Sequence, residues 1–127
     1  MGMRTSRVAA LAAVGAMVVG ASVAGIAQAA SGTTLKLSAS KTALKFNVTK
    51  LTAPKPGKVT LIMSNPSAIK HDIALKGGGL KRPVVGKVVG KGKTSTISAT
   101  LKKGSYTFYC SVPGHEQAGM KGKLTVK

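Results

Sequence analysis

Three side chains that suit a soft transition metal stand close together near the C-terminus, in the stretch YCSVPGHEQAGMKG (residues 109–122). Cys110 is the only cysteine of the chain, His115 follows five positions later, and Met120 follows five positions after that. A thiolate, an imidazole and a thioether can all coordinate one metal ion. A chain with a single cysteine has no internal disulfide, so the thiol needs another explanation.

The sequence around Cys110 predicts how these groups meet. Tyr106 and Phe108 share a strand face with Cys110, so we expect the sulfur to be directed into the core. Pro113 cannot continue a central strand and Gly114 permits a sharp turn, so the chain should leave the sheet after Cys110. A loop of this size can bring the sulfur, the imidazole and the thioether to one spot.

A fourth ligand has to come from elsewhere, and the only other histidine is His71, which opens an expected strand after a turn at residues 65–67. If that strand lies beside the strand of Cys110, all four side chains converge at one end of the sheet. Two histidines, a thiolate and a weak axial thioether form the ligand set of a blue-copper centre. Zinc fits less well, because methionine is not among its usual ligands.

The elements that must position these residues are short strands between turns. Apolar and polar residues alternate, and Pro and Gly mark turns, with no sustained helical period after the first 29 residues. This spacing predicts an all-β fold, a Greek-key β-sandwich or barrel. Strands are expected around residues 35–37, 44–48, 59–63, 71–75, 95–101, 106–110 and 124–126, and residues 76–93 are expected to form surface loops with one short strand.

Residues 1–29 have the pattern of a secretory signal peptide. Arg4 and Arg7 precede an apolar run, and Ala27-Gln28-Ala29 fits a small-residue cleavage site. We expect cleavage after Ala29, export to the periplasm, cell surface or exterior, and one domain over residues 30–127. The alternative is an uncleaved membrane anchor, because the apolar run is nearly long enough to span a bilayer.

The chain is strongly basic, with a formal net charge of +18, or about +16 without residues 1–29. Nucleic acid is not the expected partner, because the lysines are spread along the chain and aromatic residues are scarce. Two interpretations remain. The charge attracts acidic protein partners or an anionic cell-surface polymer, or it is a solvated coat that keeps a monomer soluble.

The segment YTFYCSVPGHEQAGMKGKLTV (residues 106–126) resembles the copper-binding loop and last strand of the cupredoxin family, the small type 1 blue-copper proteins. The segment SNPSAIKHDIAL (residues 64–75) resembles the part of these proteins that carries the first histidine. This resemblance implies a cupredoxin-like β-sandwich over residues 33–127 with one copper ion. It implies that the ligands are His71, Cys110, His115 and Met120.

The resemblance also implies roles for residues around the ligands. The family often has Asn after the first histidine, where this chain has Asp72. Its backbone N–H could donate to the Cys110 sulfur, and its carboxylate could accept from Ser111. Glu116, the other acidic residue of the chain, is expected at a solvated position in the loop.

The function expected from this site is that of an exported electron carrier, whose copper ion cycles between Cu(I) and Cu(II) and connects larger redox proteins, one with an acidic surface. Four ligands leave no open position for a substrate, so the protein is not expected to be an enzyme. The alternative is a protein that delivers or sequesters copper with the same ligands. A basic β domain without metal would leave the spacing of Cys110, His115 and Met120 unexplained.

Overall fold

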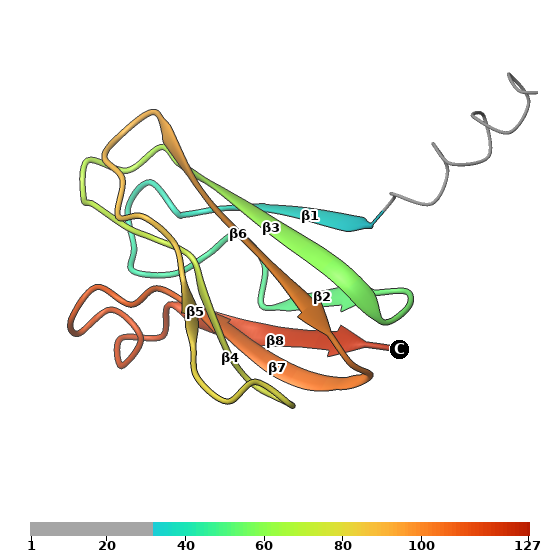
Figure 1. Cartoon of the computed structure of the whole chain (residues 1–127). Coiled ribbons are helices and arrows are strands. Elements are labelled where there is room, and N and C mark those ends of the chain that lie inside the picture. Colours follow the sequence, from blue (N-terminus) through green and yellow to red (C-terminus); the bar gives the residue numbers. More distant parts are fainter. Residues whose placement is uncertain (1–31) are drawn as a thin grey trace, which may run out of the picture. The chain divides into compact units, whose positions relative to one another are not determined.

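The structure, a computed structural model, describes residues 32–127, which form eight strands and no helix (Figure 1). The expected signal peptide, residues 1–29, lies outside the described residues. No helix in the described part of the chain could cross a membrane. The strands are β1 (Thr33–Ser38), β2 (Lys50–Ala53), β3 (Gly57–Asn65), β4 (Ala74–Gly77), β5 (Val84–Val85), β6 (Lys93–Leu101), β7 (Gly104–Tyr109) and β8 (Lys121–Val126).

The strands form two sheets that face each other (Figure 1). One sheet has the order β1-β3-β6 and the other the order β2-β8-β7-β4-β5. Strands far apart in the sequence are neighbours, such as β4 and β7, which pair antiparallel, and β2 and β8, which pair parallel. The prediction of an all-β sandwich is therefore confirmed for residues 32–127.

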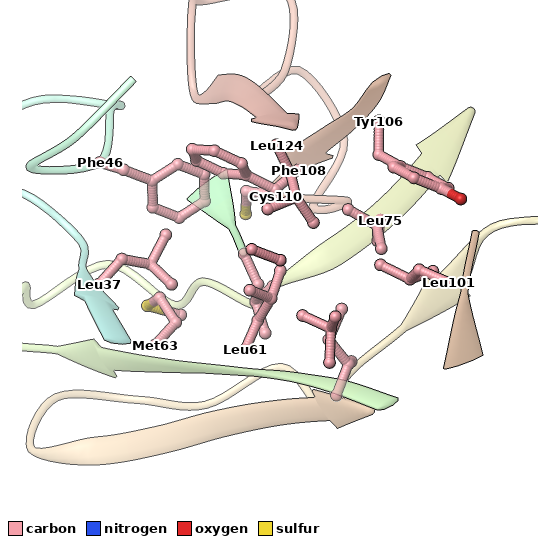
Figure 2. Close-up of a cluster of buried hydrophobic side chains, with 14 of the residues drawn as sticks. Leu37, Phe46, Leu61, Met63, Leu75, Leu101, Tyr106, Phe108, Cys110 and Leu124 are labelled. Atoms are coloured by element: carbon pink, nitrogen blue, oxygen red, sulfur yellow. The ribbon is translucent and has the colours of Figure 1, made fainter. Parts of the chain in front are cut away.

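The core lies between the two sheets and follows from the alternation in each strand. In β3, Val59, Leu61 and Met63 are buried, whereas Lys58 is exposed. Figure 2 shows Leu61 and Met63 facing side chains of the opposite sheet, including Phe108, and Cys110 lies in the same buried cluster. Burial of such apolar surface is the main stabilising term of folding, so β7, which leads directly into Cys110, is firmly anchored.

Residues 44–48, expected as a strand, form none in the structure, so that prediction was wrong. Phe46 has only a single bridge to Ala39, yet it is 4% exposed and packs its ring on Phe108, with the ring centroids 5.6 Å apart. Asn47 bonds to the end of β1: its side chain accepts from the Ser38 N–H at 2.9 Å, and its own N–H donates to the Ser38 carbonyl at 2.8 Å. The apolar alternation at residues 44–48 therefore results from the burial of one aromatic ring and does not indicate a paired strand.

Three connections gather at one end of the sandwich, on the left in Figure 1: residues 66–73, 86–92 and 110–120. The register explains why. Ala74 at the start of β4 lies opposite Tyr109 at the end of β7, and Tyr109 lies opposite Lys121 at the start of β8. The residues just outside these strands therefore adjoin one another, and they include His71, Cys110 and Met120.

Candidate metal centre

Three of the expected ligand residues lie within reach of a single metal ion. The Nδ1 atoms of His71 and His115 are 3.2 Å apart, and the Cys110 Sγ lies 3.9 Å from the first and 3.5 Å from the second. A point equidistant from these three atoms lies about 2.1 Å from each, within the range of zinc bonds to imidazole nitrogen and thiolate sulfur, about 2.0–2.3 Å. The donors therefore fit one transition-metal ion.

Burial differs between the two histidines. His71 and Cys110 are fully buried, and His115 is partly exposed. The donor atoms thus lie at the boundary between the apolar core and the end of the sandwich. A metal ion there would be shielded from water on the side of His71 and close to the surface on the side of His115.

The loop between β7 and β8 is held by its own backbone. The Cys110 N–H donates to the Met120 carbonyl at 3.1 Å and closes the neck of the loop. Within the loop, the N–H groups of His115 and Met120 donate to the carbonyls of Val112 and His115 at 3.0 Å and 3.1 Å. Gly114 has a φ of 85°, which favours glycine and permits the turn just before His115.

Met120 completes the set of residues that the sequence singles out. Its side chain is fully buried and belongs to the same apolar cluster as Cys110. Its backbone is bonded to Cys110 and to His115, so the fold fixes its position relative to both residues. A thioether in such a place can pack as an apolar group and also offer a weak bond to a metal ion.

Asp72 connects the two loops that carry the donor atoms. Its N–H donates to the Cys110 Sγ at 3.5 Å. Its carboxylate accepts from the Ser111 N–H at 2.6 Å and, through the other oxygen, from the Ser111 hydroxyl. Asp72 is fully buried, and a buried carboxylate is tolerated only when its oxygens are hydrogen-bonded in this way.

The surroundings favour the metal-binding form of His71 but disfavour that of Cys110. Burial lowers the pKa of His71, and the nearby His115 lowers it further, so the imidazole is held neutral as metal binding requires. Burial raises the pKa of the Cys110 thiol, against the effect of N–H donors from Asp72 and Val112. A metal ion must therefore displace the thiol proton to gain the thiolate.

Glu116 lies in the loop and is partly exposed, but its carboxylate is paired rather than free in solvent. Its Oε2 lies 2.5 Å from the Lys76 Nζ, and that ammonium group is 4.4 Å from the centre of the Tyr109 ring. The contact of Lys76 could not be predicted from the sequence, because only the pairing of β4 with β7 brings this residue over Tyr109. The ion pair is partly exposed, so it contributes little to stability. It does connect the ligand loop to β4.

An all-β sandwich with a buried thiol and two imidazoles at one end defines a copper-binding class of protein. Residues 33–127 match the family of copper binding proteins described as the plastocyanin/azurin family, and the chain belongs to this family. Its cofactor is a copper ion, in agreement with the donor set. The resemblance to the cupredoxins is confirmed.

Solved structures with the same fold include two auracyanins and an amicyanin. Reduced auracyanin from the photosynthetic bacterium Roseiflexus castenholzii is 26% identical, with a TM-score of 0.68 over 76% of this chain and 98% of that chain. Auracyanin A, a "blue" copper protein from Chloroflexus aurantiacus, is 24% identical, with a TM-score of 0.64 over 76% and 100%. Amicyanin from Paracoccus versutus is 22% identical, with a TM-score of 0.55 over 74% and 81%. The last two show a likeness of fold alone.

Replacement of Asp72 should destabilise the metal-free protein through the loss of its hydrogen bonds with Ser111. We expect Asp72→Ala to lower the free energy of unfolding by about 2–3 kcal/mol, since it leaves a partly buried N–H unpaired and removes bonds to a charged acceptor. Asp72→Asn keeps an acceptor for that N–H and should lose less. Chemical denaturation of both variants measures the difference. Equal free energies of unfolding for the two variants would show that these hydrogen bonds do not stabilise the protein.

Proposed function

We propose that the protein is an exported blue-copper electron carrier. The copper ion would be held by the Nδ1 atoms of His71 and His115, by the thiolate of Cys110 and, more weakly, by the thioether of Met120. The convergence of three donor atoms around a point about 2.1 Å from each, a normal bond length for such ligands, is the observation that supports this most directly. Bound copper supplies a one-electron couple between Cu(I) and Cu(II).

The residues around the donors suit electron transfer rather than catalysis. Backbone hydrogen bonds and Asp72 hold the two loops in place before any metal binds. A site held in this way changes shape little when its charge changes, which keeps the cost of electron transfer low. Four side chains leave no open position at which a substrate could bind, so we do not propose an enzyme.

Electrons would enter and leave where His115 approaches the surface. The side chain of His115 is partly exposed, while Val112 is partly buried against the core and Pro113 is exposed beside it. These neighbouring loop residues would form a small apolar surface beside His115. A partner docked there would come within a short distance of the metal, because no further layer of protein lies between His115 and solvent.

The charge of the chain favours a partner with an acidic surface. A hollow of about 510 Å³ on the outer side of β4, β7 and β8 is lined by Lys76, Lys121 and Lys123, and by Glu116, which is paired with Lys76. In the sheet, Thr107 lies opposite both Lys76 and Lys123, so it separates the two ammonium groups. Carboxylates of a partner would be attracted to this hollow, next to the loop that carries His115.

Residues 1–29 support export, because they combine a basic start, an apolar run and a small-residue cleavage site. Export also suits the single thiol, since coordination of copper would protect it from forming disulfides with other proteins. We propose that the mature protein begins at Ala30 and acts as a monomer outside the cytoplasm, with an anionic cell-surface polymer as a further place of association.

Copper binding should give the protein an intense visible colour. Titration of the purified protein with Cu(II) is expected to produce a thiolate-to-copper absorption band at one equivalent, and Cys110→Ser should abolish it because an alkoxide does not replace the soft thiolate. A colourless complex of wild-type protein with one copper ion would overturn the proposed site.

The same preparation separates an electron carrier from a copper-delivery protein. A preformed site should keep its copper through repeated oxidation and reduction in the presence of a competing chelator. Rapid loss of Cu(I) to the chelator, or transfer to a metal-free acceptor protein, would favour delivery or sequestration of copper instead.

Met120 should set the reduction potential. Met120→Gln replaces a soft thioether with a harder oxygen donor that favours Cu(II), so the potential is expected to fall while copper stays bound. Protein-film voltammetry of the two proteins measures this shift. An unchanged potential would show that Met120 only packs against the core.

The lysine-lined hollow should attract redox-active anions. We expect Lys123→Glu to slow oxidation of the Cu(I) protein by hexacyanoferrate(III) about threefold to fivefold at 0.1 M ionic strength, where screening acts over about 10 Å and leaves only nearby charges effective. Lys58→Glu makes the same charge change at an exposed position on the other sheet and should have less than about half this effect. Equal effects would indicate a general coat of charge, and stopped-flow kinetics distinguishes the two cases.

A further inference from the structure

A buried amide holds the connection between β3 and β4. Asn65, the last residue of β3, is 1% exposed. Its Nδ2 donates to the carbonyls of Ile69 and Val89, each at 2.9 Å, and its Oδ1 accepts from the Ser67 N–H at 2.9 Å. The side chain thus satisfies three backbone groups from two connections that are distant in sequence.

Neighbouring groups reinforce this arrangement. Ser67 is 3% exposed, and its hydroxyl oxygen accepts from the Ile69 N–H at 3.0 Å. The carbonyl of Asn65 accepts from the Gly92 N–H at 2.6 Å. The segments 65–69 and 89–92 are therefore fixed to each other at the end of the sandwich that carries the donor atoms. We call Asn65 and Ser67 together the Asn65 clamp.

The Asn65 clamp reaches His71 through Val89. The carbonyl of Val89, which accepts from the Asn65 amide, also accepts from the His71 N–H at 3.2 Å. The Val89 N–H donates to the His71 carbonyl at 2.8 Å. Both backbone groups of His71 are therefore bonded to a residue that Asn65 holds in place.

The ring of His71 has no comparable support of its own. Its Nδ1 faces His115 and Cys110, whereas its Nε2 is buried and has no hydrogen-bond partner among the described residues. Histidines that bind metals are usually oriented by a hydrogen bond from the second ring nitrogen. Here the backbone and the surrounding packing must orient the ring.

We propose that Asn65 is a positioning residue for the metal centre: through Val89 it fixes the backbone of His71, so that Nδ1 faces Cys110 and His115. This inference rests on the proposed role of His71 as a ligand. A buried amide that bonds only to backbone groups would thus orient His71, a role that a hydrogen bond at Nε2 has in many metal sites. Loss of the amide should let the ring turn or shift even though the rest of the sandwich stays folded.

The test compares Asn65→Ala with Tyr106→Phe. The Tyr106 hydroxyl accepts from the Lys102 N–H at 3.1 Å and donates to the Lys102 carbonyl at 2.8 Å, before the start of β7 and thus at the opposite end of that strand from Cys110. Both changes remove side-chain bonds to the backbone and should lower the stability of the metal-free protein. Only Asn65→Ala should move the NMR signals of the His71 ring and amide in that protein.

Copper affinity gives a second measurement on the same variants. Asn65→Ala should weaken copper binding about tenfold, as loss of an outer support of a ligand does, and should shift the visible and electron paramagnetic resonance spectra. Tyr106→Phe should change the affinity less than about twofold, since a protein that remains folded presents the same site. Unchanged His71 signals and unchanged affinity in Asn65→Ala would overturn the inference.

Ser67→Ala carries the test if Asn65→Ala does not accumulate as folded protein. It removes the acceptor of the Ile69 N–H but keeps the Asn65 side chain, so it loosens only Ile69, whose carbonyl Asn65 holds. A smaller shift of the His71 signals in the same direction is therefore expected, and no shift would contradict the proposal. The NMR measurement needs no metal. A wild-type protein without a blue band would therefore sink the proposed function, whereas unmoved His71 signals beside a normal blue band would sink this inference alone.

Discussion

The antiparallel pairing of β4 with β7 is the constraint on which the metal centre depends. It sets Ala74 opposite Tyr109, so the residues just before β4 meet the residues just after β7. His71 then faces Cys110, and Asp72 lies where it can bond both the Cys110 sulfur and Ser111. A slip of one residue would turn every side chain of the strand to the other face of the sheet and separate the donors. The apolar core enforces this register, because Leu75 and Phe108 are buried only in it.

Polar groups buried at this end of the sandwich are nearly all satisfied. Asn65, Asp72 and Ser95 hydrogen-bond to backbone groups of other segments, and Ser67 bonds to the Ile69 N–H of its own connection. These bonds offset the cost of removing the side chains from water. The ring of His71 is the exception: its Nδ1 faces other donor atoms, and its Nε2 has no hydrogen-bond partner within residues 32–127. An unpaired buried ring nitrogen is costly, and we propose that coordination of copper by Nδ1 would offset this cost. The fold therefore positions these residues before any metal binds, and a bound copper ion would make their arrangement favourable.

The acidic and the basic residues have different roles in this domain. The two acidic residues of residues 30–127 both follow an expected ligand in the sequence, and both are used as ties between segments, Asp72 to Ser111 and Glu116 to Lys76. Apart from Lys76, no lysine within residues 32–127 is paired with an acidic side chain, and Lys121 and Lys123 line the hollow on the outer side of β4, β7 and β8. A domain of this charge attracts anions from all sides, so selectivity has to come from local shape beside the metal centre.

The sequence by itself determined the kind of chemistry and the class of fold. The single cysteine, the two histidines and the spacing to Met120 allow few sites other than one for copper, and the alternation in β3, β6, β7 and β8 is unambiguous because each strand has one buried face. Alternation failed at residues 44–48, where Phe46 is buried as a single ring without a strand. Only the tertiary structure decided that Lys76 meets Glu116 and that Asn65 supports His71 through Val89. These contacts join segments that are distant in the chain, and the register between strands, which no local pattern encodes, places them side by side.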